Sequence, residues 1–182
     1  MRHALNTILL LLVATSSSWA LSEPAATPAP QPPAVQPFAS DGDAAATLKG
    51  YLDRMNRLYE TDSKEGYSIL NSTAKMENAT HHVRIVIDTK RALVYVFLNR
   101  YLSLPNDHSN RDAVLRDLMK RNWDLNIGKF EWDPSDGEVR FSYCFTTENG
   151  IGYEAFEAIV NTLLETGDKV WPELKKMVDG GK

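Results

Sequence analysis

The sequence predicts one α+β domain in which helices pack on an antiparallel sheet, in the order αβββαββα. Three observations support this prediction. Apolar residues recur at helical spacing near both ends of the domain, over residues 43–59 and from Tyr153 onward. Residues 83–88 alternate between apolar and polar, which is typical of a half-buried strand. A Pro-Ser-Asp-Gly turn joins two further apolar strands, which indicates a hairpin.

Length and charge limit the classes of protein to which this chain can belong. With 182 residues, 43% of them hydrophobic and 24% charged, the chain has room for one ordinary globular core. The formal net charge is −4, and no basic stripe is visible along the sequence. Proteins that bind duplex nucleic acid need such a stripe to displace counterions, so we expect no nucleic acid partner.

The first 20 residues have the three-part layout of a secretory signal peptide. Arg2 and His3 precede a mostly apolar run over residues 4–13, and small residues then lead to Ala20. The apolar run is about half of the roughly 20 residues that span a bilayer, so we expect no stable membrane insertion. A permanent anchor is the alternative. Cleavage near Ala20 would make the mature protein periplasmic or secreted.

A Pro/Ala-rich linker is predicted over residues 21–42. Its segment SEPAATPAPQPPAVQPFAS has little apolar mass, and its prolines block helix and ladder hydrogen bonds. We therefore expect a disordered, extended segment that either tethers the domain or is a passive tail. The folded domain is expected over residues 43–182.

The first half of the domain predicts a helix followed by three strands. Apolar residues at three- and four-residue spacing predict one helix face formed by Leu48, Tyr51, Leu52, Met55, Leu58 and Tyr59. The expected strands cover residues 67–74, 83–88 and 92–98. The last of these, ALVYVFL, is apolar on both faces, which favours a central strand covered on both sides.

Two more helices are expected in the second half. The first covers residues 111–122, with Val114, Leu115, Leu118 and Met119 facing inward. The second begins near Tyr153 and keeps one helical phase to Met177. Pro172 lies within it and should kink or restart the helix, because proline cannot donate a hydrogen bond to Asp168.

The hairpin over residues 128–133 and 138–145 allows its register to be predicted. If Asp133 faces Glu138, then three further pairs follow: Trp132 with Val139, Glu131 with Arg140, and Phe130 with Phe141. This single register places the aromatic residues on one face and the opposite charges of Glu131 and Arg140 on the other. Gly137 is available for a left-handed position in the turn.

The stretch over residues 123–174 resembles the second half of YbjN domains. The resemblance rests on four short motifs: NIGKF at 126–130, DGEVR at 136–140, GYEAF at 152–156 and WPEL at 171–174. The family is described as bacterial sensory transduction regulators, and its fold is similar to that of the type III secretion chaperones. The resemblance implies a type III secretion chaperone-like fold and a polypeptide partner, and it allows a homodimer. It supplies no catalytic residues.

No catalytic, cofactor-binding or metal-binding residues are predicted. The sequence lacks nucleophile-elbow, Walker and His-Glu-x-x-His motifs. His81 and His82 are adjacent, so on a strand they point to opposite faces and cannot share a metal; His108 lies in a loop. Cys144, the single cysteine, is interpreted as a small buried hydrophobe with an inert thiol, and an intermolecular disulfide is the alternative.

The hairpin also provides the candidate partner-binding residues. Its aromatic face is expected to pack under the helices. The opposite, mixed face carries the four residues that we predict to bind a partner: Lys129, Glu131, Arg140 and Ser142. The hypothesis is a non-catalytic, exported protein-binding module that is chaperone-like or regulatory. The alternatives are a small-ligand sensor with a cavity between sheet and helices, and an enzyme with an unrecognised site.

Overall fold

The structure, a computed structural model, describes residues 41–180 apart from Thr89 and Asn149. The predicted signal peptide and most of the predicted linker therefore lie outside the described residues. The described elements follow one another as α1 (Asp41–Arg54), β1 (Tyr59–Lys64), β2 (Tyr67–Lys75), β3 (Thr80–Asp88), β4 (Leu93–Ser103), α2 (Arg111–Asp124), β5 (Lys129–Trp132), β6 (Glu138–Thr146) and α3 (Tyr153–Val178).

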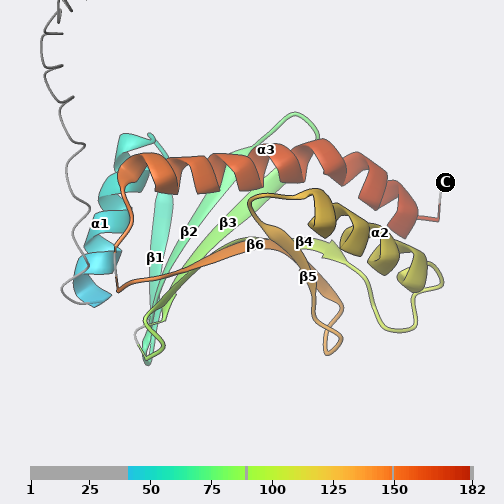
Figure 1. The fold of residues 1–182 in the computed structure, drawn as a ribbon, viewed down its shortest axis with the longest axis horizontal. Coiled ribbons are helices and arrows are strands. Elements are labelled where there is room, and N and C mark those ends of the chain that lie inside the picture. The colour runs from blue at the N-terminus through green and yellow to red at the C-terminus, as the bar shows by residue number, and fades with distance from the viewer. Residues whose placement is uncertain (1–40, 89, 149, 181–182) are drawn as a thin grey trace, which may run out of the picture. The chain divides into compact units, whose positions relative to one another are not determined.

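The strands form a six-stranded antiparallel sheet in the order β1-β2-β3-β4-β6-β5. The helices lie on one side of this sheet, with α3 running across the strands and α2 beside β5 (Figure 1). The core lies between the sheet and the helices, where Phe141, Phe156 and Leu163 are fully buried. The predicted α+β class is confirmed, and the structure adds one strand, β1, to the predicted order.

The hairpin register predicted from the sequence is confirmed. Phe130 pairs with Phe141, Glu131 with Arg140, and Trp132 with Val139. Gly137 adopts a φ of +76°, in the left-handed region that favours glycine. A Cβ atom there would lie 2.8 Å from the backbone oxygen of Leu104, so the position excludes larger residues sterically as well.

The first helix is shorter than predicted, because it ends at Arg54. Asn56 has a φ of +53°, and the chain turns there. Leu58, which was predicted to face the core, is 91% exposed, and Tyr59 begins β1 instead. The residues of β1, YETDSK, are polar and mostly exposed, so their strand is defined by hydrogen bonding to β2 rather than by an apolar pattern.

Strand β4 is central, as predicted, but helices cover only one of its faces. It lies between β3 and β6, and it continues to Ser103, five residues beyond the predicted end. The pairing with β6 shifts between Leu98 and Leu102, where Arg100 has a φ of +51°. This irregularity allows a long strand to bend, which a short apolar run does not predict.

Helix α2 differs from the prediction on its outer side. Val114 and Leu118 are buried as expected, but Met119 is 68% exposed. Trp123, at the end of the same helix, is 90% exposed. Helical spacing assigned Met119 to the inner face because it follows Leu115 by four residues. In the structure α2 contacts β5 and α3 through a narrower stripe of residues.

Candidate functional site

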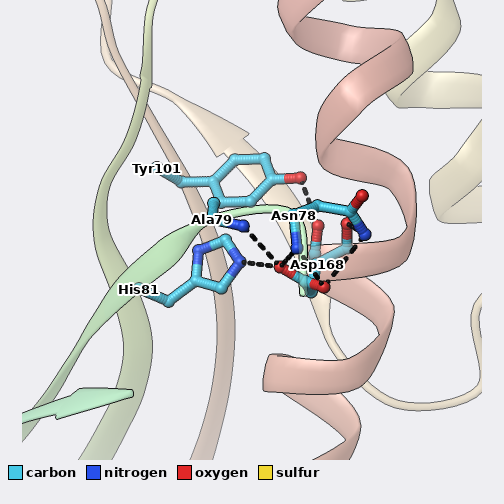
Figure 2. A network of polar contacts seen from close by, with 6 residues as sticks. Asn78, Ala79, His81, Tyr101 and Asp168 are labelled. Carbon is cyan, nitrogen blue, oxygen red and sulfur yellow. Dashed lines mark hydrogen bonds and ion pairs between the residues drawn. The ribbon is translucent and has the colours of Figure 1, made fainter. Parts of the chain in front are cut away.

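A buried carboxylate, Asp168 of α3, holds the helix against the connection between β2 and β3 (Figure 2). Its two oxygens accept hydrogen bonds from the backbone amides of Asn78 and Ala79, at 3.0–3.1 Å. The Asn78 side chain donates at 3.0 Å, and Nε2 of His81 lies 3.2 Å from Oδ1. The ring of His81 stacks on Tyr101, whose hydroxyl donates to the Gly167 carbonyl at 2.7 Å.

The same cluster compensates for the proline in α3. Pro172 has no amide hydrogen, so the carbonyl of Asp168 loses its helical hydrogen bond. The side-chain amide of Asn78 donates to this carbonyl at 3.2 Å. A residue in a turn on the sheet thus satisfies a backbone acceptor that the helix leaves open.

Electrostatics favours a neutral imidazole beside an ionised carboxylate. Burial lowers the pKa of His81, although the hydrogen bond and charge of Asp168 raise it. Burial raises the pKa of Asp168, but hydrogen bonds from Asn78, Ala79 and His81 outweigh it and lower the pKa overall. With its acceptors occupied within the domain, Asp168 has a structural role.

The face of the sheet opposite the helices is here called the open face, because no described helix packs on it (Figure 1). One continuous row of paired residues crosses all its strands: Glu60, Asn71, Arg84, Phe97, Ser142 and Lys129. A second row consists of Asp62, Ile69, Val86, Tyr95 and Cys144. The open face therefore combines charged, amide and aromatic side chains.

The structure places the four predicted binding residues together on the open face, at the β5–β6 end. Lys129 and Glu131 form an ion pair at 2.8 Å, and the hydroxyl of Ser142 donates to the other oxygen of Glu131 at 2.8 Å. Ser142 is fully buried and serves this network rather than offering a surface. The predicted Glu131–Arg140 charge pair is wrong, because Arg140 binds Glu138 instead.

Arg140 is held by several groups at once. Its bond to Glu138 raises the pKa of the guanidinium, and the guanidinium carbon lies 5.0 Å from the centre of the Phe97 ring. Its Nε is the one buried side-chain polar atom of the described residues without a hydrogen-bond partner. The ring of Phe97 in turn lies 4.8 Å from that of Tyr95. Phe97 is only 4% exposed, so these contacts bury its ring and leave Tyr95 as the partly exposed aromatic residue beside it.

Cys144 lies on the open face and is exposed, which corrects the prediction that it is buried. The alternation of residues along the hairpin predicts the mixed face for Cys144, which is confirmed, and only the interpretation as a buried thiol is wrong. In the structure it alternates with Tyr143 and Phe145, which face the helices. Partial desolvation raises the pKa of its thiol, which disfavours the reactive thiolate.

The sequence analysis missed a polar hollow of about 530 Å³ on the open face, lined by residues from β1 to β4. Arg84 lies in it, with its Nε donating to Oδ1 of Asn71 at 2.8 Å. His82, which lies opposite His81 as predicted, also lines the hollow and contacts the Thr73 hydroxyl through Nδ1 at 3.2 Å. Alternation along residues 82, 84 and 86 could have indicated a shared face, but only strand pairing brings Asn71 to Arg84.

Two kinds of feature are absent from the described residues between 41 and 180. The described residues contain no group of three or more histidine, cysteine or acidic side chains that could hold a metal ion. None of the described helices is both long and apolar enough to cross a membrane.

Comparison with known proteins gives a family and a fold. The model of the YbjN family, described as "Putative bacterial sensory transduction regulator", matches residues 44–176. A chain in the crystal structure of the ExsC–ExsE complex aligns with a TM-score of 0.50 and 15% identity, covering 72% of this chain and 95% of that one. A chain in the structure of the HopA1–SchA chaperone–effector complex aligns with a TM-score of 0.48 and 12% identity, covering 71% and 92%.

No curated protein sequence matches the chain at a significant level. The family match confirms the resemblance found in the sequence, and it extends the matched region from residues 123–174 to most of the domain. The alignment with the ExsC–ExsE structure supports the predicted type III secretion chaperone-like fold.

Proposed function

We propose, from the premise that this chain belongs to the YbjN family, that its domain is a non-catalytic module that binds polypeptide through the open face of its sheet. The observation that carries the proposal is the one-sided packing of the sheet. The helices lie on one face, whereas the other face carries Tyr95, Val86 and Arg84 without a described helix over them. Aromatic and arginine side chains are favoured anchors at protein interfaces.

The fold supports the same proposal by analogy. The similar structure is a complex, ExsC with ExsE, and its likeness to this chain concerns the fold alone. A chaperone-like or regulatory role, rather than chemistry, is therefore what we propose for this chain. The small-ligand sensor is less well supported, because fully buried side chains such as Phe141, Phe156 and Leu163 fill the space between sheet and helices.

Site-specific crosslinking tests the proposed binding face. A photo-crosslinking amino acid placed at Tyr95 of the full chain should form adducts with a polypeptide in the producing cells. The same group at Lys169, which is exposed on α3, is the control and should give none. The partner should then be purified and should bind the wild-type domain directly. Adducts from Lys169 alone, or turnover of a substrate by the pure domain, would contradict the proposal.

We also propose that the protein is exported and acts in the periplasm or outside the cell. The basic start, apolar run and small residues up to Ala20 support this proposal. The intact mass of the protein recovered from the periplasm or medium should correspond to a chain that begins at Leu21. A mature chain that still begins at Met1 would overturn it.

Besides binding a polypeptide partner, we propose that the protein forms a homodimer through the outer side of α2. Met119 and Trp123 lie one helical turn apart on α2, and both are largely exposed. An exposed apolar pair of this kind favours association. Sedimentation of the mature chain should show a dimer that Trp123→Ala converts to monomer, whereas a wild-type monomer at all concentrations would refute the dimer.

A further inference from the structure

We infer that the hollow around Arg84 binds a carboxylate of the polypeptide partner, and that this carboxylate anchors the partner on the open face. The inference rests on the proposed function, because it identifies the chemistry that the open face recognises. The starting observation is that Arg84 has no carboxylate partner among the described residues. Arg140 and Lys129, which lie at the β5–β6 end of this face, are both paired with glutamates.

The surroundings of Arg84 prepare its guanidinium for a carboxylate. The side chain is half-buried, so part of its hydration is already removed. Asn71 accepts from Nε at 2.8 Å and fixes the guanidinium, which leaves the two Nη groups for another acceptor. Two parallel N–H donors match the two oxygens of a carboxylate, and such bidentate pairs are among the strongest hydrogen bonds in proteins.

Neighbouring side chains extend the set of donors. Nδ1 of His82 contacts the Thr73 hydroxyl, so its Nε2 remains available, and the amide of Asn99 lines the same hollow. The hollow also contains one acidic residue, Glu60. It lies beyond Asn71 in the same row, two strands from Arg84, or about 10 Å at the usual strand spacing. At that distance Glu60 weakens the attraction for an anion without neutralising Arg84 directly.

The open face also sets the spacing of the partner's side chains. Along β3, Arg84 is followed on the same face by Val86, which pairs with Ile69 and Tyr95 in the apolar row. Residues two apart in a strand are separated by about 7 Å, and an extended peptide has the same repeat. The fitting segment therefore carries an acidic residue and an apolar residue two positions apart.

Three synthetic heptapeptides test the inference, each with acetylated N-terminus. The first contains Glu and Leu two positions apart and an amidated C-terminus; the second has Gln in place of Glu. The third is the Gln peptide with a free C-terminal carboxylate, which distinguishes a terminal from a side-chain carboxylate. Titration of the ¹⁵N-labelled chain by NMR gives the dissociation constants and locates the shifts on the open face.

We expect at least one carboxylate peptide to bind the wild type about tenfold more tightly than the amidated Gln peptide. In Arg84→Gln this preference should fall to less than about threefold, whereas in Glu60→Gln affinity for the carboxylate peptide should rise by about threefold. Arg116→Gln removes an exposed guanidinium from α2 and is the matched control, which should keep the wild-type preference. Unchanged NMR spectra away from the substituted residue verify that each variant is folded.

The contrary outcomes separate this inference from the proposed function. If all three peptides shift the open face with equal affinity, or if Arg84→Gln keeps the preference, the carboxylate site is wrong but polypeptide binding stands. If none of the peptides shifts any resonance of the open face, both the site and the binding face are wrong.

Discussion

At the scale of single residues, Asp168 joins parts of the chain that are far apart in sequence. It accepts hydrogen bonds from residues 78, 79 and 81, about 90 positions earlier, and it lies on the last helix. Hydrogen bonds to a buried charged group contribute more to stability than neutral ones, and unmatched donors are costly. The Asp168 carboxylate therefore stabilises the fold more than the exposed charged side chains of the same helix do.

Asp168→Asn should lower the free energy of unfolding by about 3 kcal/mol, because the new amide hydrogens would face the donors of Asn78, Ala79 and His81. Urea denaturation measures the loss. Asp179→Asn, at the C-cap of the same helix, is the control. Its partner is Lys175 and both side chains are partly exposed, so its cost should stay below about 1 kcal/mol. Equal losses in the two variants would contradict the structural role assigned to Asp168.

The pair of His81 and Asp168 also predicts how stability depends on pH. The pKa of His81 is lowered from 6.5, so just below pH 6.5 the unfolded chain binds more protons than the folded one. The pKa of Asp168 is lowered from 3.8, so its contribution is present above pH 3.8 and is lost as the pH falls through the folded value. Both shifts make stability decrease toward acid.

The free energy of unfolding should therefore fall in two windows on acidification, beginning below pH 6.5 for His81 and below pH 3.8 for Asp168. Gln lacks a titrating ring but keeps an N–H donor. In His81→Gln the free energy of unfolding should therefore no longer fall in the window that begins below pH 6.5, whereas the fall below pH 3.8 should remain. Urea titrations between about pH 2.5 and pH 8, at intervals of about half a unit, cover both windows and measure the slopes. An upper window that persists in His81→Gln would show that another group causes it.

At the scale of elements, the hairpin of β5 and β6 is the part of the fold that sequence predicts best. Its register depends on a four-residue turn and on side chains that face each other directly, all within residues 128–146. Which of the two tryptophans near this hairpin is buried, however, depends on tertiary packing and not on the local sequence. Trp132 is partly buried against the core and donates from its indole nitrogen to the Leu104 carbonyl at 2.9 Å. Trp123 is 90% exposed.

The two tryptophans provide a matched comparison. Trp132→Ala should lower the free energy of unfolding by about 3 kcal/mol, because it removes packed aromatic surface and leaves the Leu104 carbonyl unsatisfied. Trp123→Ala should change it by less than about 0.5 kcal/mol in the monomer. Chemical denaturation at a concentration where the protein is monomeric measures both changes. A large loss in Trp123→Ala together with a small loss in Trp132→Ala would mean that the packing of this region is assigned wrongly.

A second element-scale prediction concerns the contact between Asn78 and α3. The Asn78 side chain serves a carbonyl that Pro172 leaves without its helical donor. In Pro172→Ala a backbone amide becomes available to that carbonyl, so the loss of Asn78 should matter less. Asn78→Ala should cost about 2 kcal/mol in the wild type and about 1 kcal/mol less in the Pro172→Ala background.

A double-mutant cycle measures this coupling. Lys169→Ala replaces Pro172→Ala in the control cycle, because Lys169 is exposed on the same helix and leaves the proline in place. The control cycle should be additive within about 0.5 kcal/mol. Additivity in the Pro172 cycle as well would show that the Asn78 side chain does not compensate for the proline.

At the scale of the whole molecule, one core between the sheet and three described helices accounts for the stability of residues 41–180. The core residues come from every helix and from strands β2 to β6. The predicted linker has little apolar material to add to such a core, and it carries most of the prolines of the chain. Folding should therefore depend on the domain alone.

Deletion of residues 21–38 should leave the melting temperature nearly unchanged, because the sequence of this segment is rich in proline and carries few large apolar side chains. Differential scanning calorimetry compares the deletion with the mature chain, and replacement of the same residues by Gly and Ser is the control for chain length. A fall of several degrees, which corresponds to about 1 kcal/mol in a domain of this size, would show that the segment contacts the domain.

The sequence by itself determined the features that depend on neighbouring residues. These are the α+β class, the helix beginning at Tyr153 and the Phe130–Phe141 register, because periodicity and turn chemistry are local. The family was also accessible, since its motifs are short and contiguous. The predicted face of the hairpin was correct for the same reason, although the ion pairs on it were not.

The tertiary structure alone decided the features that depend on distant partners. Strand β1 is polar, and only pairing with β2 defines it. The row from Glu60 to Lys129, and the hollow around Arg84 within it, exist because strands from different parts of the sequence lie side by side. An apolar strand such as β4 has the same sequence pattern whether helices cover one or both of its faces, so the uncovered face of β4 could not be predicted. Covering one face of the sheet is a property of the assembled layers, and residue spacing along a single strand does not encode it.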